Sequence, residues 1–269
     1  MRLAVARQMI KNNEVKVYTS RDYYEDKTRR GNNGYYVPLE EEEPEDNNTI
    51  ICETKKFPNL LVCIDNGHAS TTGGKRSPYA AYKTPPALEL YEYKFNRLVA
   101  KRLKEKLEEV GVEVYMVCPE VDRDISLTNR YTRANNAAAA AKKKAVLVSI
   151  HANAYGTGKE WNSANGWCAY TTKGQNNSDK FAECLYNAAE EMFVSLGKKI
   201  RKDFSDGDRD WESNFTIILG ANMPAVLTEN FFYTNINDCE YLLTSQAIED
   251  IAEVHFKGII EFAEKQYKM

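Results

Sequence analysis

The chain has 269 residues, of which 43% are hydrophobic and 28% are charged. This balance is typical of a folded globular protein, and it excludes a collagen, a coiled-coil rod and a wholly disordered chain. The 36 Lys and Arg residues nearly balance the 39 Asp and Glu residues, which leaves a formal net charge of −3. The chain as a whole therefore has no electrostatic attraction to nucleic acid or to an anionic membrane, and we expect neither as a partner.

Hydrophobic residues nowhere form the run of about 18 that a membrane-spanning helix needs, and the first residues lack the apolar core of a signal peptide. We therefore expect that the chain is synthesised in the cytoplasm and does not insert into a membrane. The six cysteines are far apart in the chain and include no CxxC pair. Three of them, Cys63, Cys118 and Cys168, lie in apolar runs, which favours buried, reduced thiols over disulfides or a cysteine-based zinc site.

The N-terminal part of the chain differs in composition from the rest. Residues 22–48 are rich in Tyr, Asn and charged residues and include the acidic run Glu40–Glu43. Such a run is typical of a solvated loop or linker rather than of a dedicated cation site. We predict that residues 1–57 form a largely irregular extension, with one short strand possible at Val15–Thr19. Residues 58–269 are predicted to form one folded domain.

From Leu60 onward, short apolar runs alternate with segments of helical periodicity. A helix that starts at Glu89 should end near Val110, because Gly111 can adopt the left-handed conformation that closes a helix. The run Ala145–Ile150 is apolar throughout, which indicates a strand buried on both faces. This alternation predicts an α/β domain whose helices cover both faces of one sheet. The expected strands are 60–65, 112–117, 145–150, 166–171, Phe215–Leu219 and 225–228, and the expected helices are 89–110, 126–144, 178–196 and 239–266.

Two of the three histidines follow predicted strands. His68 comes shortly after the strand at 60–65, and His151 comes directly after the strand at 145–150. In open α/β sheets, ligands bind in the crevice outside the carboxyl ends of the strands. Position alone leaves two readings open for this pair, a metal or catalytic site and a pair of structural histidines. His255, in the last predicted helix, has no such pattern and is expected to be a surface or packing residue.

A carboxylate belongs to the same region. On a helical wheel, Phe95, Val99, Leu103 and Leu107 all fall within about 60° of Glu92, so Glu92 lies at the centre of the face that packs on the sheet. An ionised carboxylate buried there costs several kcal/mol unless a positive group compensates it. The alternative is that the helix begins after Glu92, which would then be a first-turn residue favoured by the helix dipole.

His, Glu and His are ligands that Zn²⁺ accepts, and three protein ligands leave a fourth position for water. A zinc hydrolase also needs a carboxylate that is not a ligand and that acts as general base. Glu229 ends the predicted strand at 225–228 and so lies at the same edge of the sheet. Taken alone, it could equally be a residue that only caps the end of a strand.

These segments resemble one known family, the zinc-dependent N-acetylmuramoyl-L-alanine amidases of the Amidase_3 type. The resemblance runs from about Leu60 to the C-terminus, and several motifs in the same order make it specific. The matching residues are Cys63-Ile64-Asp65-Asn66-Gly67-His68; Glu92 with Asn96 and Ala100; Asp122-Arg123-Asp124 with Leu127, Arg130 and Ala134-Asn135; Ser149-Ile150-His151-Ala152-Asn153-Ala154; Pro224–Phe232; and Asn235, Asp238 and Leu242.

The resemblance implies one Zn²⁺ per chain, bound by His68, Glu92 and His151, with Glu229 as the catalytic acid/base. It implies hydrolysis of the amide between N-acetylmuramic acid and L-alanine in peptidoglycan, and a three-layer αβα fold with a twisted, mostly parallel sheet. We separately expect the protein to be a monomer. Two positions depart from the family pattern: Ala69 stands where the family usually has glycine, and Asn66 where it usually has proline. Both departures affect backbone shape and leave the expected ligands in place.

Other readings of the same residues are another zinc peptidase or a non-catalytic peptidoglycan-binding protein. The second would be expected to lack one of the four site residues, and all four are present. Arg130 and Asn153 are interpreted as structural rather than catalytic. The basic loop 197–214 could contact an acidic stem peptide, although a solvated loop is the favoured interpretation. A phage or prophage lysis enzyme that acts on the cell wall would fit a chain made without a signal peptide.

Overall fold

The computed structural model of the chain describes residues 56–269. The strand predicted at Val15–Thr19 and all but two residues of the predicted extension lie outside the described residues. Phe57 is described: its side chain is 1% exposed, and its backbone N–H donates to the carbonyl of Val110 at 3.2 Å. Phe57, the second of the described residues, thus already belongs to the hydrophobic core.

The centre of the fold is one six-stranded sheet with the strand order β2-β1-β3-β6-β4-β5. Strands β2, β1, β3 and β6 run parallel to one another, whereas β4 is antiparallel to β6 and parallel to β5. The predicted α/β fold with a mostly parallel sheet is thus confirmed. The strands are β1 (Leu60–Asn66), β2 (Glu113–Met116), β3 (Lys144–Asn153), β4 (Cys168–Thr171), β5 (Trp211–Glu212) and β6 (Ala225–Phe232).

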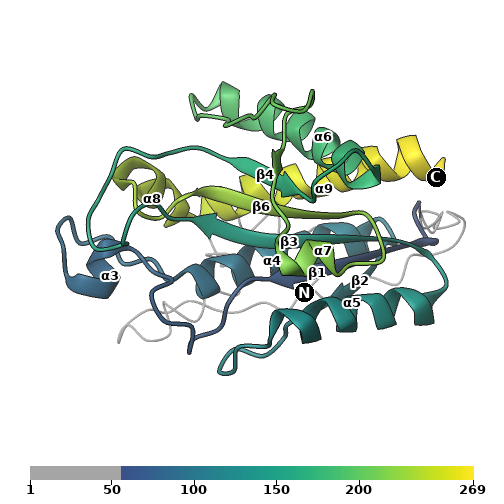
Figure 1. Cartoon of the computed structure of the whole chain (residues 1–269), viewed down its shortest axis with the longest axis horizontal. Coiled ribbons are helices and arrows are strands. Elements are labelled where there is room, and N and C mark those ends of the chain that lie inside the picture. Colours follow the sequence, from purple (N-terminus) through teal and green to yellow (C-terminus); the bar gives the residue numbers. More distant parts are fainter. Residues whose placement is uncertain (1–55) are drawn as a thin grey trace, which may run out of the picture. The chain divides into compact units, whose positions relative to one another are not determined.

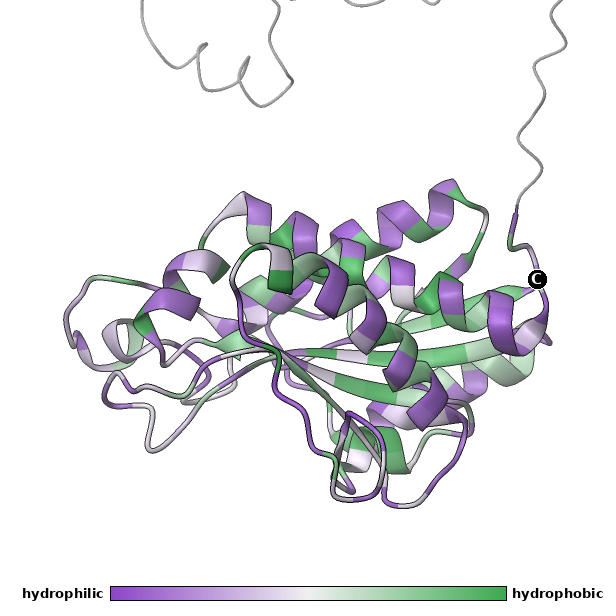
Figure 2. Cartoon of the chain, turned by 90° about the horizontal axis from the view of Figure 1, so that it is seen from above, coloured by the Kyte–Doolittle hydropathy of each residue, from purple (hydrophilic) through white to green (hydrophobic). Residues whose placement is uncertain are grey.

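Helices cover both faces of this sheet (Figure 1). On one face, α4 (Glu92–Glu109), α6 (Asn177–Ala189) and α9 (Ser245–Tyr267) enclose the larger apolar core. On the other face, α5 (Leu127–Ala141) and the short α7 (Thr216–Leu219) enclose a smaller one. All seven residues of β1 are buried, as expected for a parallel strand between two helical layers. In Figure 2 the strands are coloured as hydrophobic, while the helices carry both colours.

The predicted strand Phe215–Leu219 was wrong, because Thr216–Leu219 forms the one-turn helix α7. Its run of apolar and β-branched residues reads as a strand by local propensity alone. In the structure, the adjacent Ile217 and Ile218 are both buried and Leu219 is exposed, a pattern that a strand with alternating faces does not produce. Packing of α7 against α5 and β6 decides its conformation.

Helix boundaries differ from the prediction in four places. The predicted helix at 126–144 is α5, which ends at Ala141, and Lys144 already belongs to β3. Residues 89–91 are not helical, because Tyr91 pairs with Arg76 in an isolated bridge and α4 begins at Glu92. The predicted helix at 178–196 ends as the π-helix η1 (Glu190–Val194). The last predicted helix is divided into α8 (Ile236–Leu242) and α9, and the Thr244 side chain caps α9 by accepting from the N–H of Ala247. The sequence prediction also missed α3 (Pro78–Tyr82), which begins with a proline after the N-cap Ser77.

The cysteines of the described domain are all buried and none pairs with another: Cys63, Cys118, Cys168, Cys184 and Cys239. The prediction of reduced thiols is confirmed for these five. Within residues 56–269, no helix combines the length and the apolar character that crossing a membrane requires.

Candidate metal centre

The carboxyl ends of the adjacent strands β1, β3 and β6 carry the predicted site. His68 follows β1 by two residues, while His151 and Glu229 lie within β3 and β6. Glu92 is the first residue of α4, which packs on β1 and β3. His68, Glu92 and His151 each offer one ligand atom, and these atoms lie within 4.8 Å of one another.

Glu92 lies between the two histidines. Its Oε1 is 3.0 Å from Nδ1 of His151 and 3.3 Å from Nε2 of His68, and it also accepts from the backbone N–H of Ala152 at 3.2 Å. The two imidazole rings lie 4.9 Å apart at an angle of 84°. The Glu92 side chain is 1% exposed, so the prediction that it faces the sheet is confirmed. The alternative prediction is also partly met, because Glu92 lies in the first turn of α4.

The charges of this cluster are strongly coupled. Burial alone would raise the pKa of Glu92, but the hydrogen bond with His151 and the closeness of both histidines outweigh it and hold the pKa well below its usual range. Burial would lower the pKa of His151, and Glu92 outweighs it in the opposite direction. Glu92 is therefore an anion. Its negative charge favours either a proton on one of the imidazole rings or a cation bound between them.

The residues present fit a zinc ion. Nε2 of His68 and Oε2 of Glu92 are buried and find no hydrogen-bond partner in residues 56–269. A buried polar atom without a partner is costly unless another ligand satisfies it. Two imidazole nitrogens and one carboxylate oxygen are also the donor set of many catalytic zinc sites.

Glu229 lies beside His151, because the two residues are direct partners in the β3–β6 pairing. Its Oε2 is buried and has no hydrogen-bond partner among the described residues. Burial raises the pKa of Glu229 to about 7; the charge of Glu92 acts in the same direction, whereas the charge of His151 opposes it. The register of the pair shifts between His151 and Asn153, an irregularity that often occurs where a sheet reorients side chains beside a site.

The backbone before His68 is fixed by residues whose individual roles the sequence did not reveal. A Cβ atom at Gly67 would lie 2.1 Å from Cε1 of His151, so only glycine fits against this ring. The Gly67 carbonyl accepts from Nδ2 of Asn96 at 3.1 Å. Asn96 lies four residues after Glu92, one helical turn along the same face of α4. This contact gives a structural reason for the Glu92 and Asn96 pair in the motif.

His68 itself has a backbone φ of 66°, the left-handed conformation that costs a non-glycine residue roughly 1–2 kcal/mol. Two contacts hold it there. Nη1 of Arg97 donates to the His68 carbonyl at 2.8 Å. The next N–H, of Ala69, donates to Oγ1 of Thr72 at 3.0 Å, and Thr72 in turn donates to Oδ2 of Asp124 at 2.5 Å.

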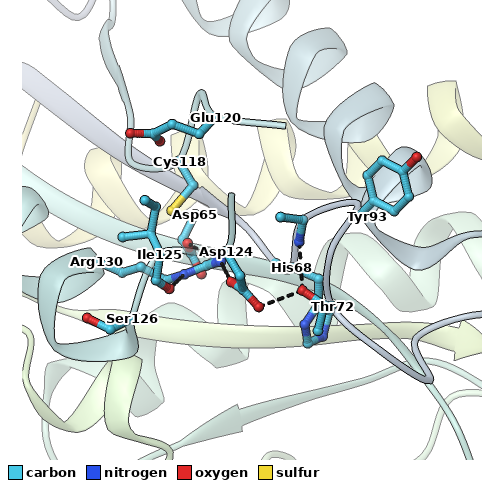
Figure 3. Close-up of polar contacts among 12 residues, drawn as sticks. Asp65, His68, Thr72, Tyr93, Cys118, Glu120, Asp124, Ile125, Ser126 and Arg130 are labelled. Carbon is cyan, nitrogen blue, oxygen red and sulfur yellow. Dashed lines mark hydrogen bonds and ion pairs between the residues drawn. The ribbon is translucent and has the colours of Figure 1, made fainter. Parts of the chain in front are cut away.

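Arg130 connects this loop to the sheet (Figure 3). Nη2 of Arg130 donates to Asp124 at 2.7 Å and Nη1 donates to Asp65 on β1 at 2.8 Å. Asp65 also accepts from the Ser149 hydroxyl on β3 at 2.6 Å. Arg130 is 3% exposed and joins α5, β1 and the His68 loop, as the structural interpretation of this residue requires.

Other predicted residues lie outside the cluster. The carbonyl of Asn153 accepts from the N–H of Tyr233 at 2.9 Å, a structural contact. His255 is fully buried and contacts Thr228 and Ile251, so it is a packing residue. In the basic loop, Arg209 pairs with Glu183 and Glu190, and Lys202 pairs with Glu190. These two charges are engaged within the domain.

Solved structures with this fold include an N-acetylmuramoyl-L-alanine amidase from Clostridium difficile 630. It is 26% identical with a TM-score of 0.63, and the match covers 78% of this chain and 99% of that one. The catalytic domain of CwlV, an N-acetylmuramoyl-L-alanine amidase from Bacillus (Paenibacillus) polymyxa var. colistinus, is also 26% identical. Its TM-score is 0.58, and the match covers 76% of this chain and 98% of that domain.

Relatives found by sequence include the endolysin of Bacillus phage SPP1, which is 28% identical over 205 residues. The match covers 75% of this chain and 65% of the endolysin. The N-acetylmuramoyl-L-alanine amidase CwlM of Bacillus licheniformis is 34% identical over 139 residues, which are 51% of this chain and 46% of CwlM. The chain thus spans less than two thirds of the length of either relative.

The sequence profile of one family, Amidase_3, described as N-acetylmuramoyl-L-alanine amidase, matches residues 62–261. The matched segment contains His68, Glu92, His151 and Glu229 and covers most of the described domain. The chain therefore belongs to the Amidase_3 family.

Proposed function

We propose that this protein hydrolyses the amide bond between N-acetylmuramic acid and L-alanine in peptidoglycan. The observation that carries the proposal is the convergence of His68, Glu92 and His151 at one sheet edge, with Glu229 on the adjoining strand. Family membership supplies the reaction class, and the matched residues 62–261 contain the whole cluster.

His68, Glu92 and His151 are the proposed ligands of one zinc ion. Zinc held there would supply Lewis-acid polarisation of the scissile carbonyl and of the attacking water. The chain's contribution is to keep the three donors together and both rings oriented. Gly67 leaves room for the His151 ring. Arg97 binds the backbone carbonyl of His68, and Thr72 binds the backbone N–H of the next residue, Ala69.

Glu229 is the proposed acid/base. In this proposal its carboxylate accepts the proton of the attacking water and then delivers it to the leaving amine of alanine. A pKa of about 7 supports both steps, because a group that titrates near the working pH can take up and release a proton readily. A buried Oε2 without a partner is also free to accept that proton.

The biological setting is part of the proposal. One relative is a phage endolysin, which supports a role in lysis of the cell wall, and bacterial wall remodelling is the alternative setting. Both settings use the same bond cleavage, so the activity can be tested without deciding between them.

The test is digestion of purified peptidoglycan followed by mass spectrometry of the released fragments. The proposal predicts muramic acid with a free lactyl carboxyl group and stem peptides with a new N-terminal alanine. Cleavage at another peptide bond would replace the proposal with a peptidase. Binding without any cleavage by the zinc-loaded full chain would replace it with a binding protein.

A further inference from the structure

A second acidic cluster lies where the loop before β5 meets the N-terminus of α6, and it shares no residue with the candidate metal centre. It consists of Asp179 on α6 and of Asp208 and Asp210 in the loop. Each offers one carboxylate oxygen, and these oxygens lie within 4.8 Å of one another. The Asp179 and Asp210 residues are only 3% and 1% exposed.

The three carboxylates are held in the same way. In each, Oδ2 accepts a hydrogen bond from a neighbouring group, while Oδ1 is buried and has no partner within the described part of the chain. The donors to Oδ2 are the Asn176 N–H for Asp179, the Gln175 side-chain amide at 2.8 Å for Asp208, and the Thr171 hydroxyl at 2.5 Å for Asp210. One oxygen of each residue is thus fixed and the other is left for a ligand.

No positive side chain in the described domain, residues 56–269, compensates this cluster. Arg209 lies between Asp208 and Asp210 in the sequence, but its guanidinium pairs with Glu183 and Glu190 instead. Among residues 56–269, no Lys, Arg or His forms an ion pair with any of the three aspartates. Burial, together with the nearby Asp208, raises the pKa of Asp210 to about 8. Three like charges this close together, two of them on buried residues, require a proton or a cation.

We propose that Asp179, Asp208 and Asp210 bind one Ca²⁺ ion. Three carboxylates without nitrogen or sulfur donors favour a hard cation over zinc. Ca²⁺ accepts a flexible and irregular shell of oxygen ligands, whereas Mg²⁺ demands near-ideal octahedral geometry and gives up its waters reluctantly. An irregular set of three carboxylates, two of them on buried residues, therefore favours Ca²⁺. Asp208 is only partly buried, so water can complete the coordination shell.

The bound ion fastens one edge of the sheet to the helix layer. Asp210 immediately precedes β5, the edge strand next to β4, and Asp179 belongs to the first turn of α6. Without the ion, repulsion among the carboxylates works against this junction. Calcium therefore stabilises the domain through this loop, independently of any reaction at the zinc site.

The experiment uses the full chain, freed of metals by a chelator and dialysed. CaCl₂ is titrated into the parent protein and into the Asp208→Asn and Asp210→Asn variants by calorimetry, and thermal unfolding is followed with and without calcium. Asp122→Asn is the matched control, because it removes the same charge from an exposed position. The titration is repeated with MgCl₂, and with CaCl₂ on zinc-loaded parent protein.

The parent should bind about one Ca²⁺ with or without zinc, and its melting temperature should rise with calcium. The two cluster variants should bind it at least about tenfold more weakly, and the control should behave as the parent. Metal-free Asp210→Asn should melt no lower than the metal-free parent, since it loses a like charge, but calcium should stabilise it less. Three results would contradict the proposal. If calcium neither binds to the parent nor raises its melting temperature, a shared proton compensates the three carboxylates. If the parent binds Mg²⁺ more tightly than Ca²⁺, the choice of ion is wrong. Equal calcium binding by parent and variants would mean an adventitious ion only. No outcome depends on amidase activity.

Discussion

Gly67 lies so close to His151 that a Cβ atom at this position would be 2.1 Å from Cε1 of the imidazole ring. The glycine cannot easily move away, because its N–H donates to the Ile150 carbonyl at 3.1 Å and its carbonyl accepts from Asn96. The two residues are far apart in the sequence. They meet because Gly67 directly follows β1, His151 lies in β3, and these two strands pair with each other. The position of one proposed zinc ligand therefore depends on the absence of a side chain at Gly67.

Gly67→Ala is expected to displace the His151 ring and to weaken zinc binding by at least about tenfold, the scale seen when a ligand's supporting contacts are lost. Overpacking should also destabilise the domain by about 1–3 kcal/mol. Zinc affinity is measured by competition with a chromophoric chelator. Gly73→Ala is the control, since a Cβ there meets nothing within 4 Å. If Gly67→Ala bound zinc as tightly as the parent, the His151 ring could move without weakening zinc binding, and the prediction would be wrong.

Thr72→Val tests whether the loop after His68 is held by its hydrogen bonds. The substitution keeps the shape of the side chain but removes the contacts with the Ala69 N–H and with Asp124. We expect zinc affinity to fall by about 10–100-fold, while the metal-free variant unfolds close to the parent temperature. Thr128→Val, at an exposed position of α5, should change neither quantity. Equal zinc affinity in the two variants would exclude a positioning role for Thr72.

The sequence could predict the parts of the site that follow from periodicity and strand order. The spacing of Phe95, Val99 and Leu103 predicts that Glu92 lies on the inward face of its helix, and all of these residues are buried. The two histidines are predicted at one sheet edge because parallel strands bring their carboxyl ends together. Thr72 and Asp124 are 52 residues apart, and nothing in their local sequence indicates that they meet. Such a contact depends on two loops whose paths only the tertiary structure fixes.

The fold could also be predicted from periodicity and strand order. The prediction failed where local propensity and tertiary packing favour different conformations. Strands β1 and β3 are continuous apolar runs that two helical layers bury, so composition alone located them. The segment at α7 has equally strand-like residues, yet its short length lets it turn once and bury Ile217 and Ile218 together. The two-residue strand β5 carries no periodicity that a sequence could show.

Glu229→Gln and Glu92→Gln separate the roles of the two glutamates. Glu229→Gln cannot accept a proton at neutral pH, so it should bind zinc normally and lose roughly 10²–10⁴-fold in turnover. Glu92→Gln replaces an anionic ligand by a neutral one and should weaken zinc binding itself. Zinc content and turnover are measured on the same preparations. If zinc were lost from the Glu229 variant and kept by the Glu92 variant, the two roles would be exchanged.

A shortened chain that begins at Lys56 is expected to fold and to hydrolyse peptidoglycan. It keeps Phe57, which is 1% exposed in the core, and all four proposed site residues. Its melting temperature and activity are compared with those of the full chain. An insoluble or inactive product would mean that residues before Lys56 are needed by the domain.

His255 should make the stability of the domain depend on pH. Its Nδ1 donates to the Ile251 carbonyl at 2.7 Å, so in the neutral ring Nε2 accepts from the Thr228 hydroxyl at 2.8 Å. Burial lowers the pKa of His255 to about 4, against 6.5 for an ordinary histidine.

Between pH 6.5 and about 4 the unfolded chain therefore binds this proton and the folded chain does not, so stability falls as the pH falls through this range. The loss is at most about 3 kcal/mol, the equivalent of the pKa difference. The denaturant midpoint of the metal-free chain, measured at pH 7.5 and pH 4.5, should drop on acidification. His255→Gln cannot take up the proton and should show a smaller drop, even if it is less stable at pH 7.5. An equal drop in both proteins would mean that other groups, and not His255, cause the acid sensitivity.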